Sequence, residues 1–159
     1  MSFMKKGILA VAVTTSMVIA TTSIAQPANS EKQAQRATEL RQSVFKLLSS
    51  NMGPLGAMAK GKIPVDAAVA EKNAIRINQL SLMIADYTRT DTSKFEVETE
   101  ALDKVWQDPE LFAKNIEKLT LASSALIAAA KSKDASAIKK AIGGVGKTCG
   151  GCHDDFKEE

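Results

Sequence analysis

Residues 134–156, DASAIKKAIGGVGKTCGGCHDDF, carry apolar side chains at helical spacing and contain the motif Cys149-Gly150-Gly151-Cys152-His153. Cys149, Cys152 and His153 stand at positions i, i+3 and i+4, so on a helix their side chains share one face. They are the only two cysteines and the only histidine of the chain. The two thiols and the imidazole therefore belong to a single site.

The C-x-x-C-H pattern favours covalent attachment of haem. Two thiols can add to the two vinyl groups of a haem, and the adjacent imidazole can bind its iron. The alternatives are a local disulfide, a redox pair and a zinc site. A thioredoxin-like redox pair opens a helix after a strand, whereas this motif closes the last expected helix. Zinc takes four ligands, and Asp154 and Asp155 complete the set only if the chain bends sharply back.

Residues 1–25 have the features of a signal peptide. Lys5 and Lys6 form a positive n-region, residues 7–20 (GILAVAVTTSMVIA) form a short apolar h-region, and Ser23 and Ala25 are small residues suited to a cleavage site. The alternative is an uncleaved anchor, but the apolar run is short and rich in Thr and Ser. We predict cleavage near Ala25 and export to the periplasm, where bacteria attach haem to this motif.

The remaining residues, 26–159, have the size of one domain. Removal of residues 1–25 lowers Lys+Arg from 21 to 19 while Asp+Glu stays at 18, which leaves a net charge of +1. The chain has no basic stripe interleaved with aromatic residues. We therefore expect neither nucleic-acid binding nor stable membrane association.

Apolar residues recur at intervals of three and four along most of the chain, which predicts an all-α protein. Ser30 is the expected N-cap of the first helix and Gly53-Pro54 its end. The link from residue 88 to 107 has room for a short helix over residues 99–106. Four helices with a tight turn before the last one indicate an antiparallel four-helix bundle. The expected helices span residues 31–52, 64–87, 108–130 and 134–156.

Arg41 stands on the apolar stripe of the first helix, in line with Phe45 and Leu48. A guanidinium at such a position needs an anionic partner, and a haem propionate would supply one. The alternative is an arginine at the edge of the stripe that extends its charged end into water. Helix position alone does not separate these two interpretations.

Four segments are similar to the cytochromes c′, the class II c-type cytochromes: residues 149–157 (CGGCHDDFK), 41–45 (RQSVF), 106–112 (WQDPELF) and 144–146 (GVG). The resemblance covers essentially all of the chain after residue 25. It implies an up-down-up-down bundle with one covalent haem c on the last helix, usually with five-coordinate iron. It also implies binding of nitric oxide and carbon monoxide, and a homodimer that pairs through the first two helices.

The resemblance also implies a role for each matching residue. Cys149 and Cys152 would form the thioethers, and His153 would be the axial ligand of the iron. Arg41 and Gln42 would contact a propionate. Phe45 would lie over the face of the iron opposite the histidine, and Lys157 would be a basic group near that histidine. A phenyl ring cannot ligate iron, and the chain has no second histidine. The methionines after residue 25 are Met52, Met58 and Met83, and we interpret Met83 as a core residue of the second helix. We interpret Trp106 as a packing anchor, with a redox relay as the alternative.

A five-coordinate haem c leaves two non-enzymatic functions open. Capture of nitric oxide is favoured, because an open iron guarded by an apolar residue selects neutral diatomic gases. Electron transfer with an unidentified redox partner is the alternative. A third class, a dithiol oxidoreductase, requires that no haem be present. The homodimer has a second motivation in the first helix. Its apolar surface, which includes Val44, Leu47 and Leu48, is wider than packing within one bundle requires, so part of it could contact a second subunit.

Overall fold

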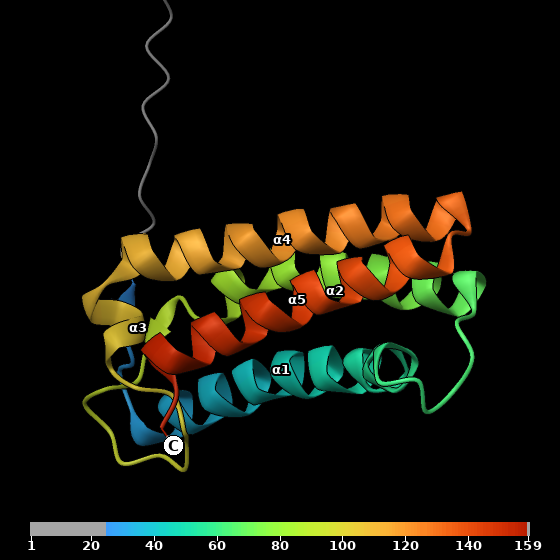
Figure 1. Cartoon of the computed structure of the whole chain (residues 1–159). Helices are drawn as coiled ribbons and strands as arrows, with labels where there is room; N and C mark the ends of the chain where they lie inside the picture. Colours follow the sequence, from blue (N-terminus) through green and yellow to red (C-terminus); the bar gives the residue numbers. More distant parts are fainter. Residues whose placement is uncertain (1–24, 159) are drawn as a thin grey trace, which may run out of the picture.

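The computed structural model describes residues 25–158, whose four long helices lie side by side (Figure 1). The chain direction reverses from each long helix to the next, and the last one packs back against the first. This confirms the all-α, antiparallel up-down-up-down four-helix bundle. The long helices are α1 (Glu31–Ala59), α2 (Ala67–Tyr87), α4 (Pro109–Ser132) and α5 (Ala135–Phe156).

Each long helix begins at a residue whose side chain accepts a hydrogen bond from a backbone N–H of the first turn. Ser30 caps α1, as the sequence predicts, and Asp108 and Asp134, the expected first residues of the last two long helices, are the caps of α4 and α5. The predicted start of the second helix at residue 64 is wrong. Asp66 accepts from the Val69 N–H at 3.0 Å, so α2 begins at residue 67.

The first helix does not end at Gly53-Pro54, contrary to the prediction. It continues to Ala59 because Leu55 and Met58, beyond the proline, are buried in the core, and burial of their side chains stabilises the last turns of the helix. Pro54 lacks an N–H and bends a helix rather than always ending it, and the end of α1 is seen nearly end-on in Figure 1. The helix stops at Gly61, whose φ of 69° suits glycine.

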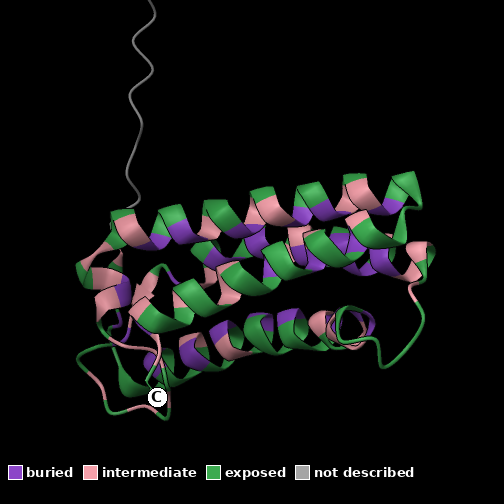
Figure 2. Cartoon of the chain, viewed as in Figure 1, coloured by how far each residue is buried: buried purple, intermediate pink, exposed green. Residues whose placement is uncertain are grey.

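The core runs along the bundle axis, where each helix presents its buried face (Figure 2). Large apolar side chains with no exposed surface fill it, among them Leu55, Ile77, Leu126, Ile138 and Val145. The seam between α2 and α4 also contains a polar cluster. Asn78 Nδ2 donates at 3.0 Å to the carbonyl of Thr120 and to the hydroxyls of Ser123 and Ser124. These bonds satisfy the polar groups that the seam buries.

The link between α2 and α4 contains a short helix, α3 (Lys104–Gln107), and a two-residue strand, β2 (Thr90–Asp91). The strand pairs in parallel with β1 (Gln26–Pro27). The expected short helix over residues 99–106 is therefore confirmed only in its second half. The strands were not predicted, because two residues are too few to show an alternating pattern.

The link is also tied to the C-terminal end of α5. The Leu102 N–H donates to the Phe156 carbonyl at 3.0 Å, and the Glu158 N–H donates to the Glu100 carbonyl at 2.8 Å. These bonds place residues 100–102 beside the last turn of the helix that carries the Cys-His motif.

The predicted signal peptide, residues 1–25, lies outside the described residues except for Ala25. Within residues 25–158, the helices are all too short or too polar to cross a membrane.

Candidate haem site

The Cys-His motif occupies the last two turns of α5. Cys149 and Cys152 are half-buried, and Cys152 packs against the hydrophobic core. His153 is exposed on the adjacent position. The helix continues to Phe156, so the i, i+3, i+4 spacing of the three side chains is kept. The structure thus places two thiols and an imidazole on one helical face.

A cavity of about 660 Å³ separates this end of α5 from α1. Its size is typical of a site for a cofactor. Part of the cavity wall is apolar and is formed by Val105, Phe112 and Phe156. The rings of Phe112 and Phe156 meet edge to face with centroids 5.1 Å apart. Cys149 does not line it, since it lies one helical turn before Cys152. The other six predicted site residues do: Arg41, Gln42, Phe45, Cys152, His153 and Lys157.

Arg41 is buried at the wall of this cavity, with 2% of its surface exposed. The interpretation of an arginine extending into water is therefore wrong. Nη2 donates to the hydroxyls of Thr38 at 3.3 Å and Thr99 at 3.4 Å, both neutral acceptors. Nη1 is buried without a hydrogen-bond partner among the described residues. Burial lowers the pKa of the guanidinium, and an anion in the cavity would satisfy both the charge and the free N–H groups.

Gln42 and Lys157 reach the cavity but are held by the link between α2 and α4. Gln42 Nε2 donates to the Glu98 carbonyl at 2.8 Å. Lys157 Nζ lies 3.0 Å from Glu100 Oε2, in an ion pair that is largely open to solvent. Both side chains therefore fasten residues 98–100 over the cavity. Residues 98–101 were missed in the sequence because the link has no helical pattern that would place it there.

Phe45 lines the same cavity as His153 and is 37% exposed. Of the three methionines after residue 25, Met58 is buried in the core, and neither it nor Met52 nor Met83 is among the residues that line the cavity. Met83 is exposed on α2, so its interpretation as a core residue is wrong. The described residues around the cavity thus offer no thioether to the position opposite His153.

The environment of the two thiols does not suit a redox pair. Burial raises the pKa of Cys149. Burial, with Cys149 and Asp155 nearby, raises the pKa of Cys152 to about 11. A reactive dithiol needs the opposite shift, toward the thiolate. Residues 25–158 also contain no group of three His, Cys, Asp or Glu side chains placed to hold a metal ion.

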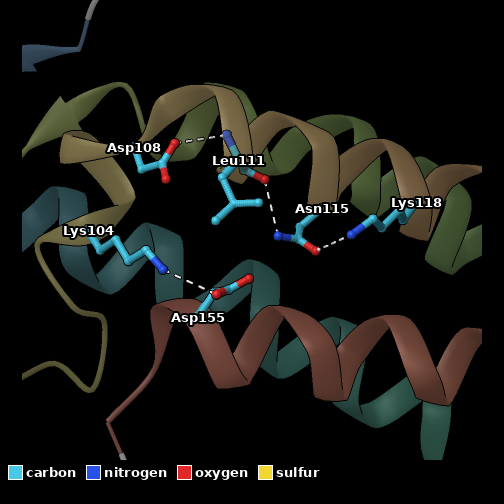
Figure 3. A network of polar contacts seen from close by, with 6 residues as sticks. All are labelled: Lys104, Asp108, Leu111, Asn115, Lys118 and Asp155. Carbon is cyan, nitrogen blue, oxygen red and sulfur yellow. Dashed lines mark hydrogen bonds and ion pairs between the residues drawn. The ribbon is translucent and has the colours of Figure 1, made fainter.

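One ion pair holds the last turn of α5 against α3, and Figure 3 shows it beside a chain of hydrogen bonds within α4. Lys104 Nζ on α3 lies 3.2 Å from Asp155 Oδ1, two residues after His153. On α4, Lys118 Nζ donates to Asn115 Oδ1 at 3.3 Å, and Asn115 Nδ2 donates to the Leu111 carbonyl at 3.1 Å. The Asp155 carboxylate is thus paired with an ammonium group.

Trp106, on α3, fits the interpretation of a packing anchor. Its ring is half-buried against the core, and Nε1 donates to the Thr88 carbonyl at 2.9 Å. The ring also faces a charge, because the Arg41 Cζ lies 5.2 Å from its centroid. This contact was not predicted, since it joins residues on two elements far apart in the sequence.

Comparison with known proteins agrees with this geometry. Residues 36–157 match the family model described as Cytochrome C′. The chain belongs to the cytochrome c′ family. Cytochromes c′ carry covalent haem c, which is therefore the cofactor of this chain. The residues present fit it: a thiol pair and an imidazole on one face, an apolar cavity, and a buried cation that lacks an anion.

Among its relatives, the chain is 41% identical over 123 residues to a cytochrome c′ of Rubrivivax gelatinosus, covering 77% of this chain and 95% of that protein. A crystal structure of cytochrome c′ from the same organism has a TM-score of 0.71 at 40% identity, over 79% of this chain and 97% of that one. The nitric oxide complex of a mutant cytochrome c prime from Alcaligenes xylosoxidans has a TM-score of 0.70 at 28% identity, over 79% and 97%.

Proposed function

We propose that this protein is a periplasmic haem c protein that binds nitric oxide and carbon monoxide at a five-coordinate iron and serves to capture nitric oxide. The observation that carries this proposal is the pair Phe45 and His153 on one cavity. His153 supplies the imidazole, and Phe45 supplies a ring without a ligating atom. The fifth ligand would then come from the protein and the sixth position would stay open to a gas.

In this proposal Cys149 and Cys152 hold the cofactor. Each thiol adds across one vinyl double bond, so that a sulfur–carbon bond forms and the thiol hydrogen passes to the other vinyl carbon. No oxidant or reductant is consumed. His153 binds the iron, while Arg41, assisted by Gln42, meets a propionate. Lys157, four residues after His153, would place a basic group on the histidine side, where it is paired with Glu100.

The apolar side chains of the cavity would give the site its selectivity. The bound haem supplies reversible ligation of diatomic gases. Phe45, Phe112 and Val105 provide no hydrogen-bond donor, so charged ligands such as cyanide and azide would gain nothing from these three side chains for the hydration that they lose. Neutral carbon monoxide and nitric oxide do not have this cost. The relative solved as a nitric oxide complex supports the same choice of ligand. The proposed role is binding, without catalysis.

The test is to express the full chain in a bacterium competent in cytochrome c maturation and to examine the periplasmic fraction. The denatured protein should keep the mass of one haem and give a c-type pyridine haemochrome. The ferrous spectrum should be high-spin and should change on addition of carbon monoxide. Protein recovered without haem would refute the central claim.

A ferrous spectrum that is already low-spin would favour electron transfer instead. It would show that a protein side chain fills the sixth position. Lys46 would then be the first candidate, because it lines the cavity from the same helix as Phe45.

A further inference from the structure

The Arg41 guanidinium has an aromatic neighbour where an acidic one would be expected. The ion pairs among residues 25–158 do not include Arg41. Its hydrogen-bond acceptors are two threonine hydroxyls, and the face of the Trp106 ring lies 5.2 Å from its Cζ. The face of an indole attracts cations, and the attraction grows when the cation is removed from water. Trp106 is thus a principal electrostatic partner of this buried charge.

The ring is itself fixed by contacts that do not involve Arg41. Nε1 donates to the Thr88 carbonyl at the end of α2, at 2.9 Å. The Trp106 N–H donates to the Asp103 carbonyl at 2.9 Å, within the turn that forms α3. With the ring held and Nη2 directed to Thr38 and Thr99, the guanidinium plane has little freedom. The unpaired Nη1 is then the group left for an external anion.

We infer that Trp106 is a positioning residue for the cofactor, holding Arg41 so that its unpaired N–H groups meet a haem propionate. This inference rests on the proposed function, because it assumes that the haem occupies the cavity lined by Arg41. A fixed positive charge beside the cofactor favours the reduced state, since reduction adds an electron. Loosening Arg41 should therefore lower the reduction potential.

The experiment is a double-mutant cycle on the haem-loaded, full-length protein. The variants are Trp106→Leu, Trp106→Phe, Arg41→Met and the combination of Arg41→Met with Trp106→Leu. The reduction potential is measured for each by spectroelectrochemical titration. Trp106→Leu should lower the potential by up to 59 mV, which is a tenfold change for a one-electron couple. Trp106→Phe keeps a ring face and should recover most of that shift.

The decisive comparison is in the Arg41→Met background. There Trp106→Leu should leave the potential unchanged, because no charge remains to be held. An equal shift in both backgrounds, or no shift in either, would overturn the inference and leave Trp106 a packing residue. If Trp106→Leu does not fold, Trp106→Phe with and without Arg41→Met carries the same comparison, with a smaller expected shift that should again appear only where Arg41 is present.

Different results would refute the proposed function and the positioning role of Trp106. Wild-type protein without covalently bound haem would refute the proposed function. Haem-loaded protein in which the effects of Trp106 and Arg41 simply add would refute only the role of Trp106. Melting temperatures do not decide between these outcomes, because the loss of a packed ring lowers stability in either background.

Discussion

At the scale of single residues, Arg41 determines how well the site holds an anion. It is buried, it lacks a carboxylate partner in the described chain, and its Nη1 is unpaired. In the haem-loaded protein Arg41→Ala should leave a propionate without its cation and cost about 2–4 kcal/mol of stability. The measurement is urea unfolding followed by circular dichroism.

The matched control is Arg36→Ala, which removes an exposed arginine from the same helix. It should cost well under 1 kcal/mol, as exposed charges generally do. Equal, small effects of the two substitutions would contradict the pairing of Arg41 with a propionate.

Phe45 should control access to the open position of the iron. Phe45→Ala removes the ring that shares the cavity with His153, so carbon monoxide should bind faster in flash photolysis and water should reach the ferric iron. Phe45→Met places a thioether there and should shift the spectrum toward low spin. Leu121→Ala, on the exposed surface of α4, is the control. Unchanged carbon monoxide kinetics in Phe45→Ala would show that the ring does not guard the iron.

At the scale of elements, a glycine within α5 and a glycine just after the end of α1 should respond oppositely to the same substitution. Gly144 lies within α5, where a Cβ would meet nothing within 4 Å, while Gly61 has a φ of 69°. Gly144→Ala should stabilise the protein by about 0.5–1 kcal/mol through helix propensity. Gly61→Ala should destabilise it by about 1 kcal/mol, because an L side chain is strained at that φ. Chemical denaturation measures both, and a loss of stability in Gly144→Ala would point to a close approach of the haem.

Two helix starts were predictable from a capping side chain, whereas the start of α2 was placed at Pro64 although Asp66 caps it, and the end of α1 is decided by packing. Asp108 and Asp134 carry their capping chemistry locally, so the starts of α4 and α5 follow from the sequence. Pro54 carries an equally local signal to stop, but burial of Leu55 and Met58 overrides it. That burial depends on the neighbouring helices, which no local pattern contains.

In the candidate site, too, the local features were predictable from the sequence and the contacts between distant segments were not. The thiols and the imidazole lie within five residues, so their shared face follows from helical geometry alone. The partners of Arg41 come from the link and from α3, more than fifty residues away. The sequence could indicate that Arg41 needs a partner, but not that Trp106 and Thr99 lie beside it.

At the scale of the whole molecule, we predict a homodimer that pairs through α1 and α2. Val44 and Leu48, two of the residues that suggested it, are buried in the core and cannot form the interface. The surface instead presents two apolar pairs at a spacing of seven residues: Leu40 and Leu47 on α1, and Ile75 and Leu82 on α2. A two-fold interface needs such a self-complementary surface.

Introduction of a charge into this surface tests the dimer. Leu47→Glu should yield monomers in sedimentation equilibrium at micromolar concentration, because pairing would bury the carboxylate. Leu121→Glu places the same charge at a leucine on α4 that is 62% exposed, and should remain dimeric. A wild-type protein that is monomeric under these conditions would rule out the predicted pairing.

Because β1 pairs with β2, cleavage of the predicted signal peptide would strengthen a hydrogen bond at the new N-terminus. The Gln26 nitrogen donates to the Arg89 carbonyl at 2.8 Å, and the Ala28 N–H donates to the Asp91 carbonyl at the same distance. Cleavage directly after Ala25 would turn the Gln26 nitrogen from a neutral amide into an ammonium group. The same contact would then be a charge-assisted hydrogen bond, roughly twice as strong as a neutral one. Removal of the leader would in that way fasten the new chain end to the segment that follows α2.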